Sequence, residues 1–251
     1  MADNHQNWAA EFNGEDEDEA LRMAIAMSLG EEPKPSSSGV IDLTEDDEGA
    51  AAAVVHLIAL KEGVVKKTWA YGQPRRGDDI KLEEVFQKHQ LQLAVLSSYQ
   101  WDEEWLFSKI DIAKAKVILI AFAASEKQKE DMRSNVPRDR IRFCFPPMQA
   151  MGAMHSKLQL LKYEGYMRIV VPTGNLMSFD WGETGTLENM VFLIDLPKFQ
   201  TAEERGAQEL TPFAEELFYF LRAQGLDEKL VLSLRNYDFT ETMRYAFVHT
   251  M

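Results

Sequence analysis

The chain has 251 residues, of which 41 are acidic and 27 basic, so its formal net charge at pH 7 is −14. A single cysteine excludes an internal disulfide and gives no cysteine spacing for a metal site. The apolar stretch at residues 50–60 is too short to span a bilayer, and the N-terminal residues lack the basic-then-apolar order of a signal peptide. The composition therefore predicts a soluble intracellular protein.

Most of the negative charge lies in residues 1–50, which hold 14 acidic side chains against two basic ones and carry −12 of the total. Residues 51–251 are almost balanced, with 27 acidic and 25 basic side chains. Blocks of like charge on this scale are typical of a solvated, disordered tail. We therefore predict a disordered acidic tail over residues 1–50 and one α/β domain over residues 51–251.

An amphipathic helix is predicted inside this tail, at residues 15–31. An acidic run comes first, as suits a helix N-terminus, and a glycine follows the last apolar turn. Leu21, Ala24, Ile25 and Ser28 fall on one stripe at helical spacing, where the two small side chains let a partner approach closely. The pattern resembles a ubiquitin-interacting motif, which implies that these four residues bind ubiquitin. The alternative is a short amphipathic helix that docks on its own domain.

A second binding motif is predicted at residues 40–48, after a Pro/Ser-rich linker. Val40, Ile41 and Leu43 form an apolar extended stretch followed by acidic residues, a combination suited to β-strand addition at a partner's sheet edge. It resembles a SUMO-interacting motif, with these three residues as the SUMO contacts. The alternative is an acidic linker that contains a few apolar residues.

Strands and helices are predicted to alternate through the domain. The β-rich apolar runs predicted as strands are 54–60, 91–97, 117–122, 141–145, 158–161, 167–171 and 190–196. A helix is expected over 80–89, capped by Asp78 or Asp79. Another is expected over 213–223, with Thr211 as its N-cap. This alternation predicts a layered α/β sandwich with a mixed sheet.

His155 and Lys157 are the most informative pair in the domain. On a strand, alternate side chains share a face, so the imidazole and the ammonium would point the same way. A neutral imidazole beside a fixed cation can attack phosphorus, because the cation holds the negative phosphate oxygens. Asn175, in the turn after the run 167–171, would add an amide donor at a strand end, and this combination suits phosphoryl transfer. The alternative is an ordinary exposed pair on a strand.

The stretch from His155 to Leu176 resembles the first HxK…N motif of the tyrosyl-DNA phosphodiesterase family, a branch of the phospholipase D superfamily. Typical members of the superfamily have an acid five positions after the lysine, where this chain has Lys162. The tyrosyl-DNA phosphodiesterase branch lacks that acid too, and Asp180 and Trp181 also fit this branch. The resemblance implies a phospholipase D-like half-domain that runs to the C-terminus.

What the resemblance implies is a nuclear DNA-repair enzyme that hydrolyses 3′-phosphotyrosyl or similar adducts at DNA ends. His155 would be the nucleophile and would form a phosphohistidine with the DNA 3′ end. Lys157 and Asn175 would bind the nonbridging oxygens of the reacting phosphate. The sequence has no glycine-rich phosphate loop or metal-ligand cluster, so this chemistry is expected to need no cofactor. Ubiquitin or SUMO bound by the tail would recruit the protein.

Three further residues are candidates for substrate binding. The family uses a glutamine beyond the asparagine, but the loop 182–189 differs in length, which leaves Asn189 or Glu188 for that role. Trp101 follows a predicted strand at a place where family members have substrate-facing residues, so its ring could stack on DNA. The alternative for Trp101 is a core aromatic side chain.

A second histidine–lysine pair is missing from this sequence. The family folds as two similar halves, and the histidine of the second half acts as the general acid. The remaining histidines, His5, His56, His89 and His249, are not followed by lysine two residues later. Three explanations stay open. The chain is a fragment or truncated gene product, or two copies assemble one site as a homodimer, or the half-domain binds DNA ends, ubiquitin and SUMO without turnover.

Overall fold

The computed structural model describes residues 59–148 and 154–250. The predicted ubiquitin-binding helix at 15–31 and the predicted SUMO-binding segment at 40–48 lie outside these residues. None of the helices in the described ranges is long and apolar enough to cross a membrane.

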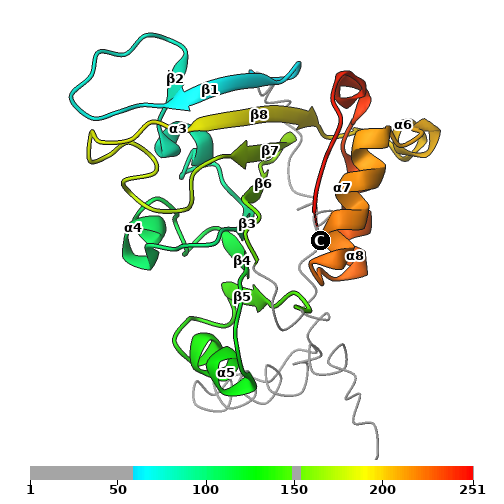
Figure 1. Cartoon of the computed structure of the whole chain (residues 1–251). Helices are drawn as coiled ribbons and strands as arrows, with labels where there is room; N and C mark the ends of the chain where they lie inside the picture. The colour runs from blue at the N-terminus through cyan, green and yellow to red at the C-terminus, as the bar shows by residue number, and fades with distance from the viewer. Residues whose placement is uncertain (1–58, 149–153, 251) are drawn as a thin grey trace, which may run out of the picture. The chain divides into compact units, whose positions relative to one another are not determined.

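One mixed sheet organises the described residues, with eight strands in the order β2-β1-β8-β7-β6-β3-β4-β5 (Figure 1). The strands are β1 (Val64–Thr68), β2 (Asp79–Ile80), β3 (Leu93–Ser97), β4 (Lys116–Ile120), β5 (Ile141–Cys144), β6 (Leu158–Lys162), β7 (Tyr166–Pro172) and β8 (Met190–Pro197). The pairs β1–β2, β3–β4 and β4–β5 are parallel, and the other neighbouring pairs are antiparallel. The predicted α/β class with a mixed sheet is therefore confirmed.

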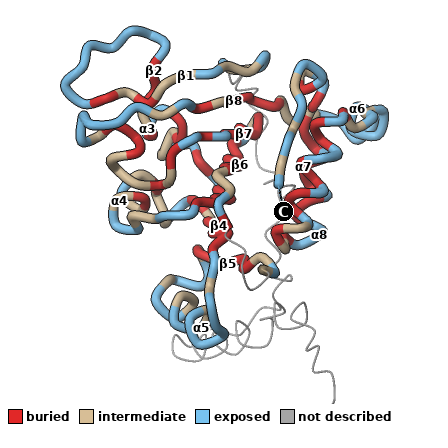
Figure 2. Tube along the Cα trace, in the orientation of Figure 1, coloured by how far each residue is buried: buried red, intermediate tan, exposed pale blue. Residues whose placement is uncertain are grey.

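Helices cover both faces of this sheet. In the described ranges they are α3 (Leu82–Phe86), α4 (Glu103–Ser108), α5 (Glu126–Ser134), α6 (Ala202–Ala207), α7 (Pro212–Ala223), α8 (Glu228–Ser233) and the 3-10 helices η1 (Leu234–Asn236) and η2 (Thr240–Arg244). Figure 1 shows α3 and α4 on one face and α7 and α8 on the other. Because both faces are covered, every residue of the central strands β3 and β6 is buried (Figure 2).

A buried ion pair ties two strands of the sheet to α3. Arg168 on β7 donates from Nε and Nη2 to the two carboxylate oxygens of Asp195 on β8, at 2.7 and 2.9 Å. Its Nη1 donates to the carbonyls of Glu84 and Val85 in α3, at 3.1 and 3.0 Å. The two charged side chains are only 3% and 1% exposed, so removing either one would leave a buried charge without compensation.

Six of the predicted strands are present, with ends that differ by at most two residues. Of the seventh, predicted over 54–60, only residues 59 and 60 are described, and neither belongs to a strand. Sequence patterns do not predict β1 and β2, because two lysines interrupt the apolar pattern of β1 and β2 has only two residues. The helix predicted over 213–223 is confirmed as α7, and the hydroxyl of its N-cap Thr211 accepts a hydrogen bond from the third residue of the helix at 3.2 Å.

The helix predicted over 80–89 is shorter than expected. It begins after an N-cap at Lys81, because the residue before this cap belongs to β2. Asp79, one of the two predicted caps, instead accepts hydrogen bonds from the Arg75 side chain and from the backbone nitrogen of Arg76. The cap prediction is therefore wrong, since this carboxylate holds the turn before β2 rather than the start of α3.

Candidate active site

One edge of the sheet carries the predicted catalytic residues. Strands β1, β7 and β3 end at this edge, and β8 and β6 begin there, as their antiparallel pairing requires. Lys157 directly precedes β6, Asn175 follows β7, and Asn189 directly precedes β8. Side chains that are far apart in the sequence therefore meet along one edge.

His155 and Lys157 lie in the segment directly before β6, which begins only at Leu158. Lys157 Nζ lies 3.0 Å from His155 Nδ1 and donates to the His155 carbonyl at 3.2 Å. Because a charged ammonium can only donate, the ring nitrogen is the acceptor of the first contact. The imidazole and the ammonium therefore share one side of this segment.

Ser156 anchors the same segment from the other side. Its hydroxyl donates to Ser97 Oγ at 3.2 Å and accepts from Gln224 Nε2 at 2.8 Å. Ser97 is the last residue of β3, and its Oγ also accepts from the backbone nitrogen of Leu158 at 2.9 Å. Gln224 is the C-cap of α7. The end of a strand and the end of a helix thus hold the histidine and the lysine in place.

Tyr99 packs against the His155 ring, with the two ring centroids 4.7 Å apart and the planes at 36°. The tyrosine follows β3 and is 52% exposed, and the histidine is exposed as well. The tyrosine therefore supports the imidazole while solvent, and so a substrate, can still reach the histidine ring.

Asn175 is held by the residues that follow it in the chain. Its backbone nitrogen and its Nδ2 donate to the same oxygen of Asp180, at 2.7 and 3.0 Å. Its carbonyl accepts from the indole nitrogen of buried Trp181 at 3.0 Å, and its Oδ1 accepts from the backbone nitrogen of Gln100 at 3.4 Å. These contacts give the amide group one orientation and leave the second hydrogen of Nδ2 for a ligand.

Two opposing influences act on the pKa of Lys157. Burial lowers the pKa of the Lys157 ammonium, and the negative charge of nearby Asp180 opposes this lowering. A partly desolvated ammonium gains more from a bound anion than one in open water does. The arrangement therefore suits a phosphate oxygen placed between Lys157 and Asn175.

Asn189 lies beside the turn that holds Asn175. Its Nδ2 donates to the carbonyl of Asp180 at 2.8 Å, and its Oδ1 accepts from Thr173 Oγ1 at 2.9 Å. A Cβ on Gly174 would lie only 2.9 Å from Asn189 Nδ2, so glycine permits this close approach. The Asn189 amide therefore lies next to the turn that contains Asn175. A role of Asn189 in substrate binding stays a prediction.

Glu188 and Trp101, the other two candidates for substrate binding, contact residues outside the predicted catalytic trio. The Glu188 carboxylate faces Lys67, 3.5 Å away, and lines a cavity between two loops. Trp101 forms a backbone bridge with Leu176 and packs, half-buried, against the core. It therefore supports the chain next to Asn175, and substrate contacts of Glu188 and Trp101 stay predictions.

Two contacts of the site are not predicted from the sequence. The sequence does contain a signal for the contact of Tyr99 with His155, because an aromatic residue directly after a predicted strand lies at the edge where strands end. It contains no signal for the contact of Gln224 with Ser156, since these residues are 68 positions apart. Long-range side-chain contacts of this kind follow from the packing of α7 and not from a local pattern.

Residues 59–148 and 154–250 contain no cluster of side chains suited to a metal ion, and their one cysteine is buried. No group of three or more His, Cys, Asp or Glu side chains in these ranges could hold a metal ion. Cys144 is buried, its Sγ donates to the Gln224 carbonyl at 3.2 Å, and burial raises the pKa of its thiol to about 12. These observations indicate that Cys144 is structural, and the expected independence from a cofactor stays a prediction.

A comparison with known protein families assigns the chain to one of them. The family model described as tyrosyl-DNA phosphodiesterase matches residues 64–251, which is more than half of the chain. The chain therefore belongs to the tyrosyl-DNA phosphodiesterase family.

Solved structures of a yeast enzyme share this fold. The chain is similar to yeast tyrosyl-DNA phosphodiesterase, with 17% identity and a TM-score of 0.55. It is also similar to a histidine mutant of yeast tyrosyl-DNA phosphodiesterase 1, with 18% identity and a TM-score of 0.55. Both alignments cover 72% of this chain and 43% of the yeast chain. This chain thus spans less than half the length of the yeast structures, and at this identity the similarity concerns the fold.

Proposed function

We propose that this chain provides the first half of a nuclear DNA-repair phosphodiesterase that removes tyrosyl or similar adducts from DNA 3′ ends. The observation that carries the proposal is the 3.0 Å contact between His155 Nδ1 and Lys157 Nζ, at the sheet edge where Asn175 is also held. Family membership supports the substrate class. The tail motifs at 15–31 and 40–48 would recruit the protein to sites marked with ubiquitin or SUMO.

In the first step of the proposed reaction, the imidazole of His155 attacks the phosphorus and the bond to the tyrosyl oxygen breaks. Phosphate oxygens that bind Lys157 and Asn175 draw the ammonium away from His155 Nδ1, which frees the lone pair of that ring nitrogen. The electron pair of the broken bond leaves on the tyrosyl oxygen. Because a phenol has a pKa of about 10, this oxygen is a good leaving group even without a strong general acid.

The second step is the attack of water on the phosphohistidine, which releases the DNA 3′-phosphate and restores His155. This step requires a group that takes a proton from water. The second-half histidine can do so once it has given up its proton as the general acid of the first step. The present sequence has no second His-x-Lys. Complete turnover is therefore expected to need a second half, supplied by another polypeptide segment or by a second copy of the chain.

The first test is incubation of the 251-residue chain with a single-stranded oligonucleotide that carries a 3′-phosphotyrosine. The expected result is a burst of tyrosine that does not exceed one equivalent per chain, together with DNA covalently joined to the protein. His155→Ala should abolish both products. His89→Ala, which changes an exposed histidine after α3, should leave both unchanged.

The other outcomes of this test are equally informative. Tyrosine release that continues beyond one equivalent, with a dimer in solution, would mean that two copies form a composite site. Failure to form either tyrosine or protein-linked DNA, when the chain binds the oligonucleotide, would contradict the nucleophilic role of His155.

A second candidate function is a binding module without turnover, which the missing second His-x-Lys favours. In this case the chain would bind DNA ends through the sheet edge and ubiquitin or SUMO through its tail. Titration calorimetry with free ubiquitin would test the tail, and Ile25→Asp should abolish the binding. SUMO binding should respond to Ile41→Asp and not to Ile25→Asp.

A further inference from the structure

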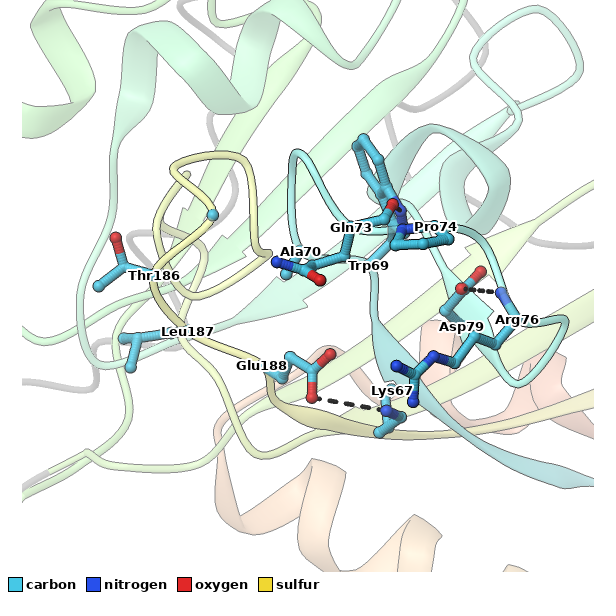
Figure 3. Close-up of a pocket in the computed structure, with 11 residues that line it drawn as sticks. Lys67, Trp69, Ala70, Gln73, Pro74, Arg76, Asp79, Thr186, Leu187 and Glu188 are labelled. Carbon is cyan, nitrogen blue, oxygen red and sulfur yellow. Dashed lines mark hydrogen bonds and ion pairs between the residues drawn. The ribbon is translucent and has the colours of Figure 1, made fainter.

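A cavity of about 420 Å³ lies between the loop that joins β1 to β2 and the loop before β8 (Figure 3). Its size falls within the range of roughly 300–1,000 Å³ that is common for small-molecule sites. Among its lining residues are Lys67, Trp69 and Arg76 from the first loop region, and Leu187 and Glu188 from the second. His155, Lys157 and Asn175 are not among its lining residues, although Asn175 belongs to the same β7–β8 connection as Leu187 and Glu188.

The two loops are fastened to each other, so the cavity is preformed. The backbone nitrogen of Tyr71 donates to the carbonyl of Gly182 at 2.8 Å. Gly182 has a φ of +78°, and a Cβ at this position would lie 2.3 Å from the Trp69 carbonyl oxygen. Only glycine therefore allows the loops to approach this closely.

The walls of the cavity differ in chemical character. Figure 3 shows Lys67, Arg76 and Glu188 gathered on one side and Trp69 with Pro74 on the other. The Trp69 ring is held in place by a hydrogen bond from its indole nitrogen to a backbone carbonyl at 2.8 Å and by a lysine ammonium 4.1 Å from its centroid. A nucleotide has the matching asymmetry, with a flat base at one end and an anionic phosphate at the other.

The first loop region is positively charged although the domain as a whole is nearly neutral. Residues 66–81 contain five basic side chains (Lys66, Lys67, Arg75, Arg76 and Lys81) and two acidic ones (Asp78 and Asp79). Arg75 is neutralised by Asp79 and Glu84. Arg76 has no ion-pair partner in the described part of the chain, so its guanidinium is available to a phosphate.

The cavity continues the sheet edge on which the predicted catalytic residues lie. Along this edge the strands follow in the order β6, β7, β8 and β1, so that Lys157, Asn175 and Asn189 lead towards the loop that follows Thr68. The backbone of Thr68 is hydrogen-bonded to Asn189 at 2.8 Å. Three strand spacings amount to about 14 Å. A single strand is at least as extended per nucleotide as the B-form rise of about 3.4 Å, so this length corresponds to about four nucleotides at most.

We propose that this cavity is a subsite for the single-stranded DNA that leads to the reacting 3′ phosphate, with a base stacked on Trp69 and a backbone phosphate bound by Arg76 and Lys67. The inference rests on the proposed function, since it takes DNA as the ligand of the sheet edge. It adds a second contact region within about four nucleotides of the reacting phosphate.

The test is the affinity of the 251-residue chain for 3′-phosphorylated oligonucleotides of increasing length, from about two to about eight nucleotides, measured by fluorescence anisotropy. Affinity should rise when the oligonucleotide becomes long enough to reach the cavity. Trp69→Leu should remove this gain and weaken binding of the longest oligonucleotide by about fivefold or more, whereas Trp69→Phe should retain most of it. Arg76→Gln should reduce the slope of log affinity against log salt by about 0.7, the value for one lost phosphate contact with a single strand.

The matched control is Lys127→Gln, which removes one positive charge from α5 beside the opposite end of the sheet. This variant should show the length dependence of the unmodified chain. Length dependence that survives both Trp69→Leu and Arg76→Gln would overturn the proposal. The proposal would also be wrong if Arg76 mattered only for substrates extended on the peptide side of the phosphotyrosine, because the cavity would then hold the protein adduct.

Binding and cleavage separate this inference from the proposed function. A chain that forms no tyrosine and no protein-linked DNA, but whose length dependence requires Trp69 and Arg76, would refute the phosphodiesterase and keep the subsite. Cleavage that depends on His155, without any effect of Trp69→Leu or Arg76→Gln on affinity, would refute the subsite and keep the phosphodiesterase.

Discussion

Two hydrogen bonds from Asn175 converge on one carboxylate oxygen of Asp180, from the backbone nitrogen at 2.7 Å and from Nδ2 at 3.0 Å. The charge of the same carboxylate acts on Lys157 and raises the pKa that burial lowers. One buried acid thus orients one predicted phosphate ligand and adjusts the charge of the other. Asp180 is a positioning residue in this geometry, because it acts through these two side chains.

Asp180→Asn should weaken the binding of a 3′-phosphorylated oligonucleotide by roughly tenfold or more. The reason is the loss of charge-assisted hydrogen bonds to Asn175, which contribute about 1.5–3 kcal/mol when one partner is ionised. Fluorescence anisotropy at constant salt measures the effect. Asp139→Asn, which changes a carboxylate that is 75% exposed, is the control and should have no effect. Unchanged affinity in Asp180→Asn would contradict the positioning role.

The pH dependence of phosphate binding should report the lowered pKa of Lys157. An ordinary lysine loses its proton near pH 10.5, and because the pKa of Lys157 is lower, its positive charge disappears at a lower pH. Affinity for a 3′-phosphorylated oligonucleotide should therefore fall as the pH rises through this lowered pKa. In Asp180→Asn the charge that raises the pKa is gone, so the fall should move to still lower pH.

Lys157→Arg supplies the control for this pH profile. Arginine stays protonated throughout the accessible range, so the alkaline fall in affinity should disappear in this variant. A fall that persists in Lys157→Arg would assign the titration to another group.

The ion pair of Arg168 and Asp195 should be essential for stability. Asp195→Asn or Arg168→Met alone should lower the free energy of unfolding by about 3–5 kcal/mol, because the remaining charge is buried without its partner. Urea unfolding followed by circular dichroism measures this change. Lys129→Met, which breaks a pair with the 77% exposed Glu126, should cost less than about 1 kcal/mol. A loss of similar size in both pairs would contradict the assignment.

Cys144 should be unreactive while the protein is folded. Burial raises the pKa of its thiol to about 12, so the thiolate that reacts with alkylating agents is almost absent at neutral and mildly alkaline pH. Iodoacetamide should modify the cysteine only when urea unfolds the chain, and mass spectrometry detects the product. Rapid alkylation of the folded protein would show that the thiol is more accessible than its burial indicates.

Much of the sheet could be predicted because its central strands are apolar on both faces. Strands β3, β4, β6, β7 and β8 appear in the sequence as short apolar runs between polar segments, and their ends are correct to within two residues. The sequence pattern does not indicate strand β1, since Lys66 and Lys67 interrupt its apolar residues. The cavity beside Trp69 is not predicted from the sequence either, because the loop that forms it follows this strand.

The site could be predicted only where it is local in sequence. The spacing of His155 and Lys157 indicates that they share a side, and Asn175 follows a recognisable strand end. The sequence could not indicate that Glu188 pairs with Lys67, because the pairing depends on how two segments far apart in the chain pack. The same reason applies to the support that Gln224 gives to Ser156.

The hold of Gln224 on Ser156 has a consequence for the order in which the protein acquires its site during synthesis. The segment with His155 and Lys157 leaves the ribosome well before the end of α7, yet its anchor is the residue that terminates this helix. A nascent chain that stops short of Gln224 therefore carries the predicted nucleophile and the predicted phosphate ligand without one of the contacts that set their geometry. The proposed binding of a DNA end is thus coupled to completion of α7.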